Sequence, residues 1–268
     1  MRIAINHETT YSYDEPVPFA LQEIRLTPRR SNNQSIARWN IDVEGGKQEV
    51  EFTDHHANQV QLISILPGHD QITVRSEGEV ETSDSVGVTI ASSGFAPPWL
   101  FLRSTALTRP GPGIDALVAD LEPEAAGGRV HQMHELSQRI STGVRYETGR
   151  TNAMSTAEEA MVSGHGVCQD HAHIFVAAAR SLDIPARYVS GYLVMDDRVD
   201  QEATHAWAEV WVDDLGWVGF DISNGISPDE KYVRVAVGLD YQEAAPISGV
   251  RFGSAAEEMS VSVQVQQQ

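Results

Sequence analysis

Cysteine and basic residues are scarce in this 268-residue sequence, and each scarcity excludes a class of site or partner. Cys168 is the single cysteine, so the chain can form no internal disulfide and no zinc site built from several thiolates. Basic residues number 19 against 38 acidic ones, which gives a formal net charge of −19. Because nucleic acids and anionic membranes are bound by clustered positive charge, the composition argues against both as partners.

Long apolar runs are also lacking. No stretch approaches the ~18 consecutive apolar residues of a membrane-spanning helix, and the N-terminus lacks the ~7–15-residue apolar segment of a secretion signal. A lone free cysteine is typical of a reducing compartment. We therefore expect a cytoplasmic protein. With glycine counted in place of tyrosine, the hydrophobic content rises from 41% to about 46%, which predicts a folded chain rather than a disordered one.

The N-terminal third is predicted to be all β. Alternating or β-branched runs are separated by turn residues at about ten-residue spacing, which is typical of a sandwich or a meander. The expected strands cover residues 2–13, 20–28, 36–43, 48–54, 59–66 and 71–81.

A change of composition follows these strands. Small residues at 91–94 and the prolines and glycines of 109–113 enclose a short apolar segment, and together they indicate a linker. We divide the chain into a β-rich domain at 1–92, a linker at 93–113 and a catalytic core with C-terminal strands at 114–268.

The part after the linker is predicted to be α+β, because helices come first and strands follow. Helical periodicity covers 114–121 and 130–140, and Ser155 with Glu158 has the form of a capping box that starts a third helix. A fourth helix is expected over 168–182. The strands expected after it cover residues 186–195, 204–213, 217–222, 232–237 and 259–265.

Cys168 lies at the expected start of the fourth helix, after Gly164 and Gly166. The free N–H groups and the dipole at a helix N-terminus stabilise a thiolate, which is the reactive form of the side chain. A nearby imidazole would stabilise the thiolate further and prepare it for attack. A buried and inert thiol is the commoner fate of an isolated cysteine, but this position and its partners favour a nucleophile.

Two further blocks supply partners for the thiol. In the strand expected to begin at His205, the period of two places His205 on the face that carries Trp207, while alanines and valines take the core face. Asp221 lies on the next strand, after a short turn. A loop of three or five residues, or one bulge, would bring His205 and Asp221 to one face, whereas a loop of two or four would separate them. We predict the same face, with Asp221 bonded to the imidazole ring.

These three side chains together would perform acyl transfer. Cys168 attacks an amide or ester carbonyl, His205 transfers the proton to the leaving group, and Asp221 fixes the tautomer of the ring. The helix-terminal N–H of Cys168 would bind the oxyanion. Three side chains are candidates for a second oxyanion or substrate contact, and each has an ordinary structural interpretation as well: Gln169, Tyr146 and Trp207.

The residues around these blocks resemble the transglutaminase-like superfamily, and more narrowly the bacterial transglutaminase-like proteins that are often labelled cysteine proteases. The family's cysteine, histidine and aspartate fall on Cys168, His205 and Asp221. The resemblance implies a papain-like core of helices packed on an antiparallel sheet, preceded by an all-β N-terminal domain. It rests on residues 166–182, 184–192, 205–211, 216–221 and 235–241, and more weakly on the first 90 residues.

Two positions depart from the family pattern. His171 stands where an aromatic residue is common, and Ile222 and Ser223 follow the aspartate where Pro-Thr is usual. Both departures leave the three catalytic positions intact and bear on substrate preference.

The expected function is therefore that of a thiol-dependent hydrolase or acyl transferase that forms a thioester, without a cofactor or a metal. Hydrolysis is favoured, because nothing in the sequence indicates a site for an amine donor. The expected substrate is a peptide or protein, or another amide, and the oligomeric state is left open.

Three other interpretations stay open. His165, Cys168, His171 and His173 offer zinc-type ligands within nine residues. The acidic segment 195–202 lies between strands but lacks the regular ligand pattern of a calcium loop. A transglutaminase-like fold can also serve as a non-catalytic binding scaffold, although the presence of all three catalytic residues weighs against this.

Overall fold

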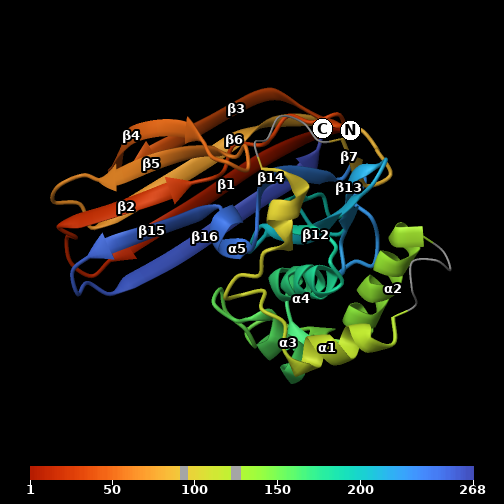
Figure 1. Ribbon diagram of the computed structural model, residues 1–268. Coiled ribbons are helices and arrows are strands. Elements are labelled where there is room, and N and C mark those ends of the chain that lie inside the picture. The colour runs from red at the N-terminus through yellow and green to blue at the C-terminus, as the bar shows by residue number, and fades with distance from the viewer. Residues whose placement is uncertain (91–95, 122–127) are drawn as a thin grey trace.

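The computed structural model of the protein describes residues 1–90, 96–121 and 128–268. Within these ranges the main sheets have four or five strands, and the longer helices gather beside one of them (Figure 1). The two termini lie side by side, as the antiparallel pairing of the first and last strands requires. No helix in the described ranges is both long enough and apolar enough to span a bilayer.

The elements are numbered in chain order, as in Figure 1. The strands of the first 90 residues are β1 (Arg2–Tyr13), β2 (Phe19–Ile24), β3 (Gln34–Glu44), β4 (Gly46–Thr53), β5 (Gln59–Ile65), β6 (Gln71–Thr82) and β7 (Val88–Thr89). The helices are η1 (Pro98–Leu102), α1 (Pro112–Ala119), α2 (Gly128–Gly143), α3 (Ala157–Ser163), α4 (Cys168–Ser181) and α5 (Tyr241–Ala244). The later strands are β8 (Arg145–Tyr146), β9 (His165–Gly166), β10 (Ala186–Leu193), β11 (Asp200–Gln201), β12 (His205–Val212), β13 (Gly216–Phe220), β14 (Tyr232–Gly238), β15 (Ile247–Phe252) and β16 (Glu257–Gln267).

The N-terminal strands form two sheets that also take in the end of the chain. The long sheet has the order β11-β16-β1-β6-β3, and the short sheet has the order β15-β2-β5-β4. The predicted core at 114–268 includes these C-terminal strands, whereas in the structure β16 pairs with β1 and β15 pairs with β2. An alternating pattern predicts a strand but not its partner, which is why the sequence did not indicate these pairings. The predicted boundary between 92 and 93 lies outside the described residues.

One face of the long sheet packs against two different neighbours. Near Tyr13 it contacts the short sheet through residues such as Ile63. Near Ile3 it contacts β10 and β14 through residues such as Val233. Burying a valine or isoleucine side chain contributes about 1.5–3 kcal/mol, so this shared face joins the β region firmly to the rest of the chain.

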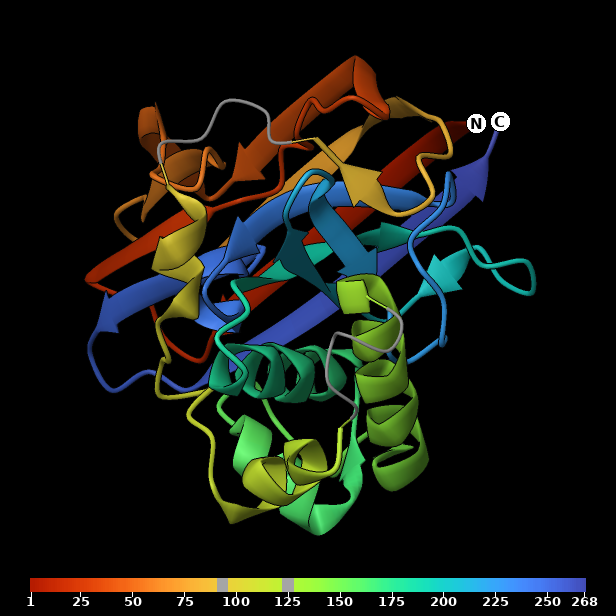
Figure 2. The same cartoon turned by 45° about the vertical axis from the view of Figure 1, so that its right-hand side comes forward.

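The core sheet has the order β14-β10-β12-β13-β7, and all of its strand pairs are antiparallel. Helix α4 lies against β12 and β10, with α1, α2 and α3 around it (Figure 2). The alanines of α4 are buried, and their small side chains let the helix approach the sheet closely. This arrangement confirms the predicted α+β class of helices packed on an antiparallel sheet.

The start of α3 differs from its prediction by one residue. Thr156, not Ser155, is the N-cap: its hydroxyl accepts from the Glu159 backbone N–H, and the Glu159 carboxylate accepts from the Thr156 N–H. Glu158 instead accepts from the backbone N–H of Gly113 at 2.6 Å, which satisfies the first turn of α1. The neighbouring residues Glu158 and Glu159 therefore cap two different helices, α1 and α3.

Candidate active site

Cys168 is the first residue of α4, where the chain turns out of the short strand β9. The Asp170 carboxylate accepts from the Val167 backbone N–H at 2.8 Å and from the Thr151 hydroxyl at 2.7 Å, which fixes the start of the helix. Gly166 faces this carboxylate closely, because a Cβ there would lie 2.6 Å from the Cβ of Asp170. The glycine next to the thiol is thus required by packing.

His205 begins β12 and Asp221 directly follows the neighbouring strand β13, and the two side chains meet on one face. The last pair of the β12–β13 ladder joins Val212 to Gly216, so three residues form the connecting loop. This odd loop length brings both side chains to the same face. Nε2 of His205 lies 2.6 Å from Oδ2 of Asp221, which confirms the predicted contact.

Asp221 is fully buried and accepts four hydrogen bonds. Its Oδ2 accepts from the His205 ring, from the Tyr232 hydroxyl at 2.7 Å and from Nδ2 of Asn224 at 2.7 Å, while Oδ1 accepts from the Asn224 backbone N–H at 3.2 Å. Burial alone would raise the pKa of Asp221, but these donors lower it below its usual value. The carboxylate is therefore ionised and held in one orientation.

The environment of His205 favours the charged ring. Burial lowers its pKa, but the hydrogen bonds with Asp221 and Cys168 outweigh burial and raise the pKa to about 10. With Nε2–H donating to Asp221, Nδ1 is the nitrogen left to exchange a proton with the thiol. The structure thus brings His205 and Asp221 into contact, and Cys168 lies near enough to raise the pKa of the ring.

The three weaker candidates lie in different surroundings. Tyr146 is half exposed on β8 and lines the cleft beside His205. Nε2 of Gln169 donates to the Ala153 carbonyl at 3.2 Å, so this side chain holds a neighbouring loop. Trp207 is buried behind the His205 ring, with ring centroids 6.2 Å apart, and does not line the cleft. It shares the face of His205 as predicted, but other residues cover it there.

A cleft of about 680 Å³ opens at His205. Its walls include Tyr146 and the loop from Met195 to Arg198, which belongs to the acidic segment considered as a calcium loop. Two carboxylates of that loop are paired with cations: Asp196 with Nζ of Lys231 at 2.8 Å, and Asp197 with Arg198 at 2.9 Å. The segment therefore lines the site instead of forming a separate turn.

Asn224 and Tyr232 are the site residues that sequence reasoning missed. An asparagine three residues after the aspartate is a recognisable turn signal, so Asn224 could have been found. Tyr232 comes from β14, two strands away from β12 in the sheet. No local pattern links it to Asp221.

The histidines of the alternative metal site bond elsewhere. His171 contacts the Ser223 hydroxyl at 2.8 Å and the Val144 carbonyl at 2.9 Å. Nε2 of His173 accepts from the Tyr241 backbone N–H at 3.0 Å. The two departures from the family pattern, His171 and Ser223, are therefore partners in one contact between α4 and the loop after Asp221.

Metal-type ligands converge at a different place in the described part of the chain. Side-chain donors of His55, His56 and Glu243 lie within 4.8 Å of one another. Nε2 of His56 lies 2.7 Å from Oε2 of Glu243, so this group joins the turn after β4 to α5. None of the three lines the cleft at His205.

Two family profiles match separate parts of the chain. Residues 117–222 match the transglutaminase-like superfamily, and residues 3–81 match the bacterial transglutaminase-like N-terminal region. An uncharacterized protein of Mycobacterium leprae is 29% identical over 98% of both chains. A further uncharacterized protein, from Mycobacterium tuberculosis, is 28% identical over 93% of this chain and 87% of its own. A protein-glutamine gamma-glutamyltransferase of Pseudomonas aeruginosa is 31% identical over 32% of this chain and 15% of its own.

The fold has a counterpart among solved structures. A crystal structure from Cytophaga hutchinsonii, described as a "Putative Cysteine Protease", aligns with a TM-score of 0.78 at 21% identity. The alignment covers 100% of this chain and 91% of that one. This similarity of fold, with the two matched profiles, confirms the predicted papain-like core and its β-rich N-terminal region.

Proposed function

Since the chain belongs to the transglutaminase-like superfamily, we propose that it is a thiol-dependent amidase or peptidase that works through Cys168, His205 and Asp221. The observation that carries the proposal is the 2.6 Å bond from His205 to the buried Asp221, on a ring whose pKa the neighbouring Cys168 also raises. A nucleophile, a base and a group that orients the base form the minimal machinery of covalent acyl transfer.

The first half-reaction forms a thioester. The Cys168 proton moves to Nδ1 of His205, Sγ attacks the carbonyl carbon, and the carbonyl electron pair moves onto oxygen. The backbone N–H of Cys168 has no partner within the helix, because Cys168 is its first residue, and it would donate to this oxyanion. As the carbonyl re-forms, the amine leaves with the proton of His205. Tyr146, on the cleft wall, is the candidate for a second oxyanion donor.

The second half-reaction depends on the acceptor. Water gives hydrolysis, and an amine gives a new amide, with His205 acting as the base in either case. We favour hydrolysis, because the cleft opens to solvent beside His205 and water can reach the thioester there. The proposed substrate is a peptide or protein, or another amide.

A peptide library, with and without an added primary amine, tests this function. We expect wild-type protein to release amines, and Cys168→Ala to lose at least about 10³-fold of that rate. Ser181→Ala, at the far end of α4, serves as the control and should match wild type. Equal activity in wild type and Cys168→Ala would favour a non-catalytic scaffold and refute the mechanism.

A further inference from the structure

A buried cluster of charge lies on the strand that carries His205. Glu209 is fully buried, Nε of Arg187 donates to it at 2.7 Å, and Nη2 of Arg234 donates to its other oxygen. Two guanidinium groups thus share one carboxylate. Burial is the main cause that lowers the pKa of Arg187 to about 10, so this group remains protonated at neutral pH. The cluster therefore holds an excess of positive charge.

Arg29 adds to this excess. Burial, followed by the positive charges of Arg187 and Arg234, lowers its pKa to about 9, while Glu209 and Asp54 act in the opposite direction. Arg29 also remains charged at neutral pH. Arg187 and Arg234 are buried with one carboxylate between them, and an unbalanced buried charge is costly, so the cluster favours a counter-ion.

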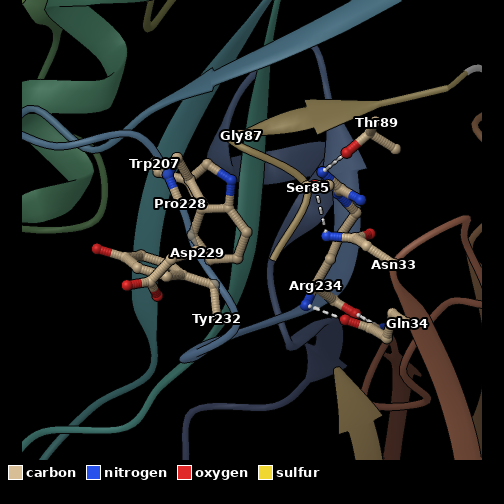
Figure 3. Close-up of a pocket in the computed structure, with 10 residues that line it drawn as sticks. All are labelled: Asn33, Gln34, Ser85, Gly87, Thr89, Trp207, Pro228, Asp229, Tyr232 and Arg234. Atoms are coloured by element: carbon tan, nitrogen blue, oxygen red, sulfur yellow. Dashed lines mark hydrogen bonds between the residues drawn. The ribbon is translucent and has the colours of Figure 1, made fainter. Parts of the chain in front are cut away.

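Two hydrogen-bond donors beside the cluster lack partners among the described residues. They are Nε1 of Trp207 and Nε of Arg234, both buried. Both residues line a cavity of about 10 Å³, which is roughly the space of one water molecule or one small ion. In Figure 3 the indole nitrogen is on the side of Trp207 that faces the Arg234 guanidinium.

We infer that this cavity binds one monovalent anion of the halide class, which accepts hydrogen bonds from Nε1 of Trp207 and Nε of Arg234. Two converging N–H donors and a local excess of positive charge are complementary to an anion. A water molecule could accept both bonds, but it would leave the charge of the cluster unbalanced.

One carboxylate also lines the cavity. Oδ1 of Asp229 accepts from the Lys231 backbone N–H at 2.8 Å. Figure 3 shows the Asp229 carboxylate on the other side of the Trp207 ring from the guanidinium of Arg234. The indole therefore separates this negative charge from the two donors.

The site is placed to influence the triad without touching the substrate. Trp207 stacks on His205 and packs edge-on against Tyr232, with ring centroids 5.4 Å apart in the second pair. Tyr232 in turn donates to Asp221. An anion bonded to Nε1 of Trp207 would thus fix the indole that packs behind the His205 ring. Trp207 would then act as a positioning residue for His205.

Crystals of the wild-type protein soaked in sodium bromide test the inference directly. We expect an anomalous peak in the cavity, within hydrogen-bond distance of Nε1 of Trp207 and Nε of Arg234. Ordered water there without a bromide signal would overturn the proposal. This readout needs neither a variant nor catalytic activity, so its failure would leave the proposed function untouched.

Thermal unfolding distinguishes a built site from an adventitious ion. At constant ionic strength, replacing gluconate by chloride should raise the Tm of wild type by several degrees and then saturate. Trp207→Phe should lose this shift, whereas Trp211→Phe should keep it, because Nε1 of Trp211 bonds to Asp213. A Tm that is the same in both salts means an adventitious ion only, and contradicts the proposal.

Discussion

At the residue scale, Asp221 organises the candidate active site. Its two oxygens take hydrogen bonds from His205, Asn224 and Tyr232, so the carboxylate has little freedom to rotate. A buried, ionised carboxylate of this kind stabilises the imidazolium form of the ring. The pKa values of the two groups move apart as a result, downward for Asp221 and upward for His205.

The raised pKa of His205 makes stability depend on pH in a defined direction. The pKa is about 10 in the folded protein against 6.5 for the free side chain, because hydrogen bonds with Asp221 and Cys168 outweigh burial. The resulting stabilisation is fully present below pH 6.5 and is lost as the pH rises through 10. Urea unfolding should therefore show the largest difference between wild type and His205→Gln at about pH 6, and a smaller one toward pH 10.

An exposed histidine provides the control for this measurement. His131 lies on the solvent side of α2, and His131→Gln should change stability little at either pH. A difference between wild type and His205→Gln that stays constant, or grows with pH, would contradict the assigned direction of the pKa shift.

The three proposed catalytic positions could be selected from the sequence, whereas the residues that hold Asp221 in place, Asn224 and Tyr232, were missed. Cys168, His205 and Asp221 stand in local patterns of glycine, alternation and turn length that point to them. Tyr232 reaches Asp221 from a strand that the sequence does not link to it. The sequence showed His171 and Ser223 only as two separate departures from a family pattern, and gave no sign that their side chains are in contact.

At the scale of single elements, the capping of α3 is the clearest test of local physics. Thr156→Ala removes the hydroxyl that accepts from Glu159 N–H and should cost about 1 kcal/mol of unfolding free energy. Ser155→Ala should cost less, because the Ser155 hydroxyl accepts only from the Asn152 N–H, outside the helix. Chemical denaturation of both variants gives the comparison. A larger loss of unfolding free energy in Ser155→Ala than in Thr156→Ala would contradict this assignment and identify Ser155 as the N-cap.

Most elements followed from periodicity, and the errors have physical causes. The strand predicted at 2–13 and the helix predicted at 168–182 match β1 and α4 closely, since both have long uniform patterns. The cap was assigned one residue early because Ser155 and Thr156 are both good N-caps followed by glutamate three positions later. Strand β15 was missed, since it is short and contains Gly249.

At the scale of the whole molecule, the last strand joins the two parts of the fold. Val263 of β16 is fully buried with Val233 of the core sheet and Ile3 of the long sheet. We expect Val263→Ala to lower the unfolding free energy by about 2 kcal/mol, through lost burial and the cavity left behind. Unfolding should remain a single transition, because both parts share this packing.

A neighbouring valine offers a matched control. Val261 lies on the same strand and is only partly buried, so Val261→Ala should cost less. Two separate transitions in Val263→Ala, with the core unchanged, would show that the β region and the core are independent units.

The path of the chain between sheets was the least predictable feature. Strands β15 and β16 return to the N-terminal sheets, and β7 crosses into the core sheet beside β13. Hydrophobic alternation determines which face of a strand is buried, but the choice of partner depends on contacts distant in sequence. The domain division at 92–93 and 113–114 stays a prediction for this reason.

The central claim is that His205 activates the thiol of Cys168, and the alkylation rate of that thiol tests it most directly. Cys168 is the single cysteine, so iodoacetamide labelling reports on one site. At pH 6, wild type should react at least about tenfold faster than free glutathione, and His205→Gln should fall to the rate of an ordinary thiol. A wild-type rate no faster than glutathione, or equal rates in wild type and His205→Gln, would contradict the account.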